Sequence, residues 1–310
     1  MTRIDRPLVF ATAFLFVLCA AFTACAGGGE VDARRAIPSP TATPEVFSNP
    51  QRVTINGYSQ DAEEPFVSRD GNYLFFDNSN NPKVNPNTDI FWATRIDALT
   101  FQYQGPIAGV DTTTSLEGVP SMDLNNVFYF ISPRSYPQTL STIYFGAFAN
   151  GAVTAAELVP GVSRLKAGWV NFDAEVSADG NTLYFVDGYF GSTGQPRSSK
   201  IEIAHKNGNT FERDKHSASI MAKINVAPLN YAGDISASEL EFFYTQASAR
   251  GTAIYTARRN DVTKPFERPI KIDAITGFSE APSISPDGHS LYYHHQEADG
   301  TFAIYRVTRP

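Results

Sequence analysis

The chain has 310 residues, of which 42% are hydrophobic and 13% aromatic, and its formal net charge is −7 at pH 7. This length and apolar fraction are sufficient for a globular protein with a large core, and the negative balance excludes the basic face that phosphate binding requires, so we expect no nucleic-acid partner. Aromatic residues among 22 glycines and 20 prolines favour strands over helices.

Residues 1–24 have the pattern of an export signal: two arginines, an apolar run and then small residues. The apolar run, 8–22, is short for a membrane span. Two cleavage sites are compatible with this leader. FTAC (22–25) resembles the bacterial lipobox, which implies that Cys25 becomes the lipidated first residue of a lipoprotein. Alternatively, ACA (24–26) fits an ordinary A-x-A site, which predicts a secreted soluble protein.

The segment 25–50 is rich in glycine and proline, and this composition predicts a flexible tether. Both cysteines, Cys19 and Cys25, lie before the tether ends, so we expect no disulfide and no cysteine-based metal site in the domain 51–310. We therefore expect an exported protein held at a membrane through a lipid anchor, on the periplasmic or the cell-surface side.

Five segments share a serine that is followed six residues later by an apolar residue and then by aromatic residues. The serines are Ser68, Ser121, Ser177, Ser236 and Ser285, at intervals of 49 to 59 residues. In three copies an Asp-Gly pair lies between the two positions and supplies the positive φ of a tight hairpin turn. The second copy has Asn in this stretch, and the fourth keeps only the spacing.

A second β-prone segment follows each serine by 18 to 24 residues, as in TDIFWATR (88–95) and FAIYRVTR (302–309). With a further run in most copies, each repeat comprises four short strands, which predicts a five-bladed β-propeller; a β-sandwich is the alternative. The last repeat ends after three strands. VTIN (53–56) has the phase of the fourth-strand segment IKID (270–273), so we predict that it pairs with the last blade and closes the ring.

The pattern P-x-x-S-x-D-G-x-x-L is clearest in PFVSRDGNYLFF (65–76) and PSISPDGHSLYY (282–293). It resembles the WD40-like (PD40) repeat of TolB-like β-propellers, over residues 51–310. The resemblance implies an all-β fold, a five-bladed β-propeller of four-stranded antiparallel blades. It implies no particular activity.

One face of such a disc receives acids from the inner strands, which converge on the central channel. These candidate funnel acids are Glu64, Glu117, Asp173, Glu175, Asp234 and Glu280. Crowded carboxylates raise the pKa of one another or hold a cation, and a pair of them is what a glycosidase uses. The alternative is that the acids only solvate the rim or cap strand ends.

The same face carries the polar loops 77–88 and 187–199, in which Tyr189 and Phe190 are candidate residues for stacking on a sugar or a peptide. A merely solvated loop is the alternative.

His294 and His295 are neighbours on a predicted strand, so their side chains point to opposite faces and we interpret both as packing residues. We assign no metal ligand, expect no cofactor, and find no motif of a nucleophile, zinc protease or P-loop.

These patterns favour a non-catalytic binding module of the cell envelope, which would use its loop-rich face for a protein or glycan partner. No catalytic residue is assigned in that interpretation. The alternative is a carbohydrate-active enzyme, similar to glycoside hydrolases, with its carboxylates in the central funnel. A structural scaffold without a small ligand is a third possibility.

Overall fold

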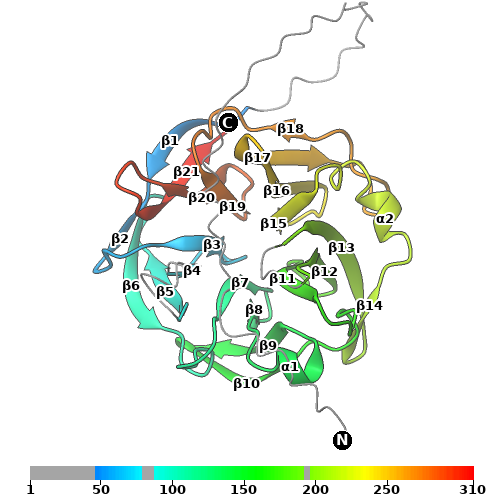
Figure 1. The fold of residues 1–310 in the computed structure, drawn as a ribbon. Coiled ribbons are helices and arrows are strands. Elements are labelled where there is room, and N and C mark those ends of the chain that lie inside the picture. The colour runs from blue at the N-terminus through cyan, green and yellow to red at the C-terminus, as the bar shows by residue number, and fades with distance from the viewer. Residues whose placement is uncertain (1–45, 79–86, 192–195) are drawn as a thin grey trace, which may run out of the picture.

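The structure, a computed structural model, describes residues 46–78, 87–191 and 196–310. Cys25, the predicted signal and residues 25–45 of the predicted tether therefore lie outside the described residues, as does most of the loop 77–88. Residues 46–50 of the tether are described: Phe47 is buried and Ser48–Arg52 form a strand. Five antiparallel sheets surround a central axis, each with its first strand innermost (Figure 1). The prediction of an all-β, five-bladed propeller is confirmed.

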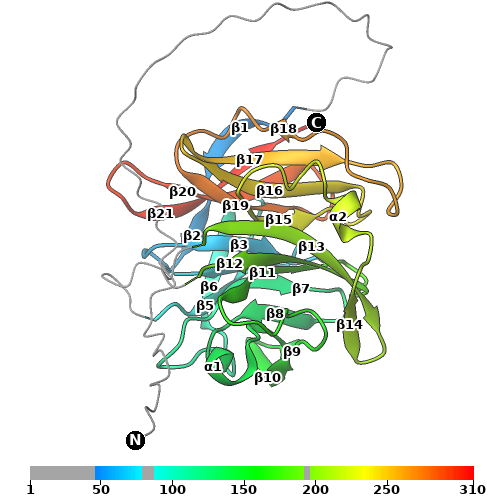
Figure 2. The same cartoon turned by 45° about the vertical axis from the view of Figure 1, so that its right-hand side comes forward.

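The strands of each blade follow one another from the axis outward, as Figures 1 and 2 show. Blade one contains β3 (Glu63–Val67), β4 (Tyr73–Asp77), β5 (Ile90–Arg95) and β6 (Thr100–Pro106). Blade two contains β7 (Gly118–Met122), β8 (Val127–Ile131), β9 (Ile143–Ala149) and β10 (Ala152–Leu158). Blade three contains β11 (Trp169–Val176), β12 (Thr182–Tyr189), β13 (Ser198–Asn207) and β14 (Thr210–Arg213). Blade four contains β15 (Leu229–Ile235), β16 (Glu241–Ser248), β17 (Gly251–Arg258) and β18 (Ile270–Lys271).

Blade five contains β19 (Ser279–Ile284), β20 (Ser290–Gln296) and β21 (Phe302–Thr308), and the N-terminal β1 (Ser48–Arg52) supplies its fourth strand. Closure by an N-terminal strand is thus confirmed. The segment 53–56 is only partly where we placed it: the Val53 N–H donates to Ile304 O of the last blade at 2.8 Å, but β2 (Thr54–Asn56) pairs in parallel with β6 of blade one. The chain bends between the two blades because the Val53 side chain is buried in the core that they share.

Two short helices, α1 (Tyr136–Thr139) and α2 (Ser217–Ile220), lie in the connections of blades two and three. Across the described ranges, no helix has the length and apolar character needed to cross a bilayer.

The turn between the first two strands of a blade is built by side chains of the repeat. In blade one, Ser68 Oγ accepts from the Tyr73 N–H at 2.9 Å and Asp70 Oδ1 accepts from the Asn72 N–H at 3.0 Å. Blade two departs from the predicted alignment because its turn is one residue shorter. Asp123, not Ser121, caps it by accepting from the Val127 N–H at 2.8 Å.

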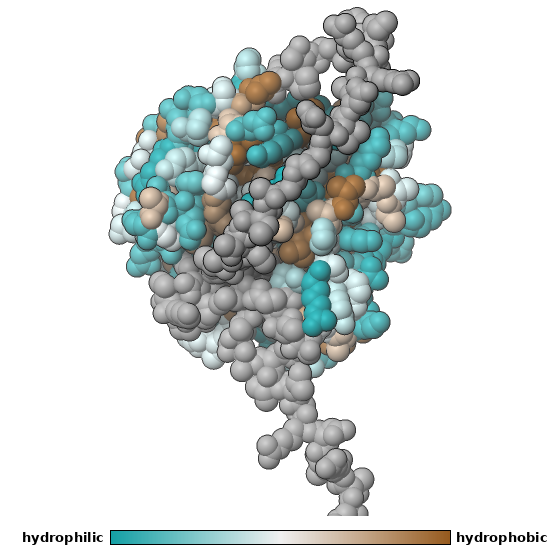
Figure 3. Space-filling view, turned by 45° about the horizontal axis from the view of Figure 1, so that its top comes forward, coloured by the Kyte–Doolittle hydropathy of each residue, from teal (hydrophilic) through white to brown (hydrophobic). Residues whose placement is uncertain are grey.

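Aromatic side chains fill the spaces between neighbouring sheets. Phe75 of blade one, for example, lies 5.1 Å from Phe128 of blade two between ring centroids, and both rings are fully buried. The visible surface is mainly hydrophilic, with apolar residues in separate small groups (Figure 3). Each sheet thus buries both faces against its neighbours, which holds the inner strands at fixed positions around the axis.

Candidate functional site

A β-bulge interrupts all five inner strands near the middle of their length. In blade one it places Glu64 at φ 47°, directly before Pro65, and Val119 and Ala281 have positive φ before a proline in blades two and five. A bulge bends its strand and changes the direction of the side chains on it. A non-glycine residue in this region of φ is uncommon and is typical of functional sites.

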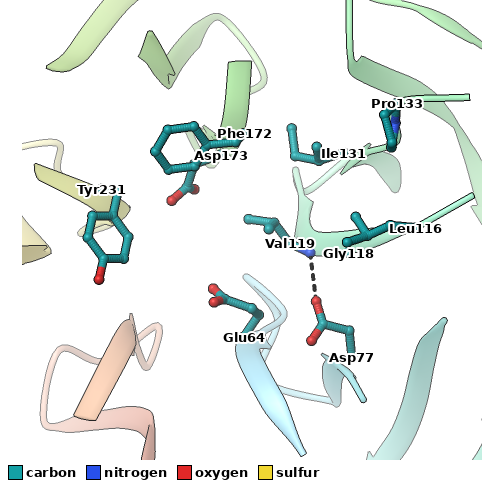
Figure 4. A pocket seen from close by; sticks show the side chains of 10 residues that line it. All are labelled: Glu64, Asp77, Leu116, Gly118, Val119, Ile131, Pro133, Phe172, Asp173 and Tyr231. Atoms are coloured by element: carbon teal, nitrogen blue, oxygen red, sulfur yellow. Dashed lines mark hydrogen bonds between the residues drawn. The ribbon is translucent and has the colours of Figure 1, made fainter. Parts of the chain in front are cut away.

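A pocket lies at the mouth of the channel, on the side of the irregular loops. Figure 4 shows the carboxyl groups of Glu64 and Asp173 directed toward one space, which the ring of Tyr231 borders. Asp77 lies behind Glu64, where its Oδ2 accepts from the Val119 N–H at 3.1 Å. The apolar walls are Leu116, Val119, Ile131, Pro133 and Phe172.

The acids of this pocket hold protons more strongly than ordinary carboxyl groups do. Burial raises the pKa of Asp173 to about 8, although the Ala232 and Ala174 N–H groups act in the opposite direction. Burial also raises the pKa of Asp77 to about 8 and that of Glu64 well above its ordinary value. At neutral pH the site therefore contains neutral carboxylic acids, which can donate a proton.

Glu280, from the inner strand of blade five, accepts a hydrogen bond from the Tyr231 hydroxyl of blade four. Its Oε2 lies 3.7 Å from His294 Nε2, while His294 Nδ1 accepts from the Glu64 N–H at 3.1 Å. An accepting Nδ1 leaves the proton of a neutral ring on Nε2, directed toward Glu280. Residues of three blades thus hold Glu280 and Glu64 beside each other.

One ligand atom each from Glu64, Glu280 and His294 lies within 4.8 Å of the others, which is compact enough for a metal ion. His294 Nε2 is buried without a hydrogen-bond partner among the described residues. A metal would need that nitrogen unprotonated, whereas the bond to Nδ1 favours a proton there. The arrangement therefore fits a shared proton better than a metal ion.

Glu175 and Asp234 lie deeper in the channel and are paired with a cation. Arg69, from the turn between β3 and β4, makes ion pairs with Glu175 and, at 3.3 Å, with Asp234. Burial raises the pKa of Asp234, while Arg69 acts to lower it. These two predicted funnel acids consequently line the channel as partners of a buried arginine and are not available as free acids.

Glu117 does not line the pocket at the channel mouth. Its Oε2 accepts from the Thr112 N–H at 2.7 Å, its Oε1 accepts from the Ser132 hydroxyl at 2.7 Å, and Arg134 lies 3.4 Å away. It forms a second compact acidic group with Asp89 and Asp111. An all-oxygen group of this kind suits a hard cation, but hydrogen bonds already occupy both oxygens of Glu117.

The two candidate aromatic residues differ in exposure. The Phe190 ring is buried and packs edge-on against Phe172 with centroids 5.6 Å apart. Tyr189 is half-buried and lies 5.3 Å from Trp169 between ring centroids. Of the two, only Tyr189 offers a surface to a ligand.

Sequence reasoning did not select Asp77, Tyr231, His294 or Arg69 for this site. Asp77 pairs in register with Glu63 across β3 and β4, and His294 pairs with Glu280 across β19 and β20. Asp77 and His294 could therefore have been predicted as site residues from their position at the end of the second strand of a blade. In an antiparallel pair, the end of the second strand lies beside the start of the first strand, where the acids are. No sequence pattern pointed to Tyr231 or Arg69.

No protein-family model matches the chain, and no curated protein matches its sequence. The structure is similar to that of a glycoside hydrolase (TM-score 0.55, 10% identity, covering 86% of this chain and 92% of that one). It is also similar to a family 117 glycoside hydrolase from the marine bacterium Zobellia galactanivorans (TM-score 0.53, 10% identity, 85% and 90%). TolB from Acinetobacter baumannii is among the structural neighbours (TM-score 0.43, 15% identity, 81% and 54%).

The two similarities with TM-scores above 0.5 support the propeller fold. The neighbours with TM-scores above 0.5 that we compare are glycoside hydrolases. Our expectation of a non-catalytic binding module is corrected by this finding, which favours the alternative of a carbohydrate-active enzyme.

Proposed function

We propose that the chain is a carbohydrate-active enzyme that hydrolyses a glycosidic bond at the mouth of its central channel. One observation carries the proposal: the carboxyl groups of Glu64 and Asp173, from two blades, face one pocket with apolar walls, which the ring of Tyr231 from a third blade borders. Glycosidic-bond hydrolysis uses two carboxyl groups, one neutral and one ionised, on opposite sides of the bond. Glycoside hydrolases with the same fold support this assignment.

Asp173 is the general acid in this proposal. Its pKa of about 8 keeps it protonated at neutral pH, so it can transfer a proton to the leaving oxygen. Glu280 is the second carboxylate. The Tyr231 hydroxyl and the His294 ring orient it, and its negative charge is one cause of the raised pKa of the adjacent Glu64.

The test is hydrolysis of a panel of aryl glycosides and polysaccharides, followed by reducing-sugar release. Asp173→Asn and Glu280→Gln should each lower kcat by about 100-fold or more, because general acid–base catalysis contributes about 10² to 10⁴. Glu212→Gln is the matched control, since Glu212 is exposed on an outer strand of blade three. Absence of hydrolysis by the wild type, or full activity of both variants, would overturn the proposal.

For the location of the protein, we propose an exported lipoprotein with signal peptide 1–24, lipidated Cys25 and a tether that ends at about residue 45, before the buried Phe47. The leader pattern supports this proposal. The turn chemistry of Ser68 and Asp70 supports membership of its repeats in the PD40 class. The enzyme would then meet glycans at the periplasmic or the cell-surface side of a membrane.

A further inference from the structure

A continuous group of side chains lies on the loop-rich side of blade three, at the start of β11. The Trp169 and Tyr189 rings are half-buried neighbours, and the Arg164 guanidinium carbon lies 4.5 Å from the centroid of the Trp169 ring. Arg164 Nε donates to the buried Asp187 at 2.7 Å, which fixes the guanidinium over the ring, while 40% of the side chain stays exposed. The two terminal nitrogens of Arg164 make no hydrogen bond to the described residues and can bind a ligand.

Two further basic residues have their backbones next to these rings. The Trp169 N–H donates to Lys166 O at 3.0 Å, and the Arg197 N–H donates to Tyr189 O at 2.7 Å, so both backbones are fixed beside the aromatic pair. The side chains of Lys166 and Arg197 are exposed and make no ion pair within the part of the chain that the structure describes.

The charge of this surface is opposite to that of the whole protein. The net charge of the chain is −7, yet the exposed charged residues beside Trp169 are Arg164, Lys166 and Arg197. The acid in the same place, Asp187, is buried and paired with Arg164 and Arg213. Lys166 and Arg197, which have no ion pair among the described residues, add positive charge beside the paired Arg164, and such a basic group on an acidic protein attracts an anion.

We propose that these residues form a subsite for a negatively charged sugar unit of the substrate, carrying a carboxylate or a sulfate. The subsite rests on the proposed function and deepens it. Trp169 and Tyr189 offer apolar faces to a sugar ring, while Arg164, Lys166 and Arg197 bind its acidic group. Trp169 precedes Asp173 by four residues on β11, which places the Cα atoms of these two residues at most about 13 Å apart at about 3.3 Å per residue.

An acidic peptide would be the other ligand for a basic surface. The aromatic pair favours a glycan, because two rings flanked by cations match a unit with both an apolar ring face and a charged substituent. The position along β11 also places such a unit within reach of the pocket that contains Asp173.

The experiment compares retardation of the full-length protein in native gels that contain polygalacturonate, its methyl ester, dextran sulfate or polyglutamate. We expect retardation by polygalacturonate and none by its methyl ester or by polyglutamate. If dextran sulfate also retards the protein, the subsite binds both carboxylates and sulfates. If dextran sulfate does not retard it, the subsite binds carboxylates. Equal retardation by polyglutamate, or none by either acidic polysaccharide, would overturn the proposal.

The variant Lys166→Ala/Arg197→Ala should weaken binding at low salt by roughly 2- to 30-fold, given about 0.2–1 kcal/mol for each of two exposed charge pairs. The matched control is Lys264→Ala/Arg268→Ala, which removes the same charge from exposed positions of blade four and should not change binding. Trp169→Leu should abolish retardation while keeping a cooperative unfolding transition. Equal effects of the two double variants would reject the subsite.

This experiment separates the two proposals. Retardation by an acidic polysaccharide without hydrolysis of any glycan would remove the enzymatic function and keep the subsite. Hydrolysis that is equally fast on neutral and acidic glycans, and unchanged in Lys166→Ala/Arg197→Ala, would keep the enzyme and remove the subsite.

Discussion

The Phe47 ring packs edge-on against the Phe243 ring, with centroids 5.9 Å apart, so the N-terminal segment is anchored in blade four as well as paired with blade five. Phe47 is 3% exposed and also lies under the guanidinium of Arg309, whose carbon is 4.7 Å from the ring centroid. The ring of blades is therefore closed by a buried aromatic contact in addition to backbone hydrogen bonds.

Phe47→Ala should lower the free energy of unfolding by about 3–5 kcal/mol, because it leaves a cavity beside a fully buried ring at the seam. Urea denaturation followed by intrinsic fluorescence measures this change. Val46 is the adjacent matched control, since it is 67% exposed. Val46→Ala should change stability by less than about 0.5 kcal/mol, and an equal loss in both variants would show that the ring contact does not stabilise the seam.

Arg69→Met should destabilise the protein by about 3–5 kcal/mol, because it leaves Glu175 and Asp234 buried without their cation. The triple variant Arg69→Met/Glu175→Gln/Asp234→Asn should recover most of this loss, since it removes all three charges. Chemical denaturation of the two variants and the wild type measures the difference. A triple variant less stable than Arg69→Met would contradict this interpretation of the channel.

Asp77→Asn should stabilise the protein progressively as the pH rises. The pKa of Asp77 is about 8 in the folded chain and about 3.9 in an unfolded one, so between these values the folded state binds more protons. The contribution of Asp77 to stability is complete below about pH 4 and is lost as the pH rises through about 8.

The measurement for Asp77→Asn is the difference in Tm between variant and wild type at several pH values from 5 to 9. The exposed Asp273→Asn serves as control, and its difference from the wild type should stay small across the range. A difference for Asp77→Asn that is constant with pH would mean that Asp77 is ionised throughout.

Cys25→Ser should move the protein from the membrane fraction to the soluble fraction of cells, because it removes the residue to which lipid would be attached. Cell fractionation with immunodetection measures the change. Cys19→Ser is the matched control and should leave the distribution unchanged. An unchanged distribution of Cys25→Ser would reject the lipoprotein proposal.

The repeat was readable because hairpin formation depends on neighbours in sequence. Ser68 and Asp70 bind backbone groups no more than five residues away, so their spacing predicted the turn directly. Blade two shows the limit of this reasoning. Its turn is one residue shorter, and Asp123 instead of the repeat serine accepts the hydrogen bond from the first residue of the second strand. Ser121 instead contacts the next blade, where it donates to Glu175 at 2.8 Å.

The candidate site was only partly readable from the chain. The inner-strand acids Glu64, Asp173 and Glu280 could be selected because the repeat phase places them at the channel. Glu117 lies four residues before the repeat serine, as Glu64 does, yet its carboxylate accepts a hydrogen bond from the Thr112 N–H in a neighbouring loop. The shorter turn of blade two decides this difference. It shifts the repeat so that Gly118 takes the position that Glu63 has in blade one, and Glu117 lies just before β7.

The sequence by itself determined the five repeats, their turns and the closing of the ring by an N-terminal strand, since these depend on alternation and turn residues over short distances. Tertiary structure alone decided which acids remain without a cation. Arg69 reaches Asp234 across 165 residues of sequence, while Asp173 has no such partner among the described residues and keeps its proton. The physical reason is that burial and charge pairing act through space, and a pKa follows from neighbours that only the closed ring brings together.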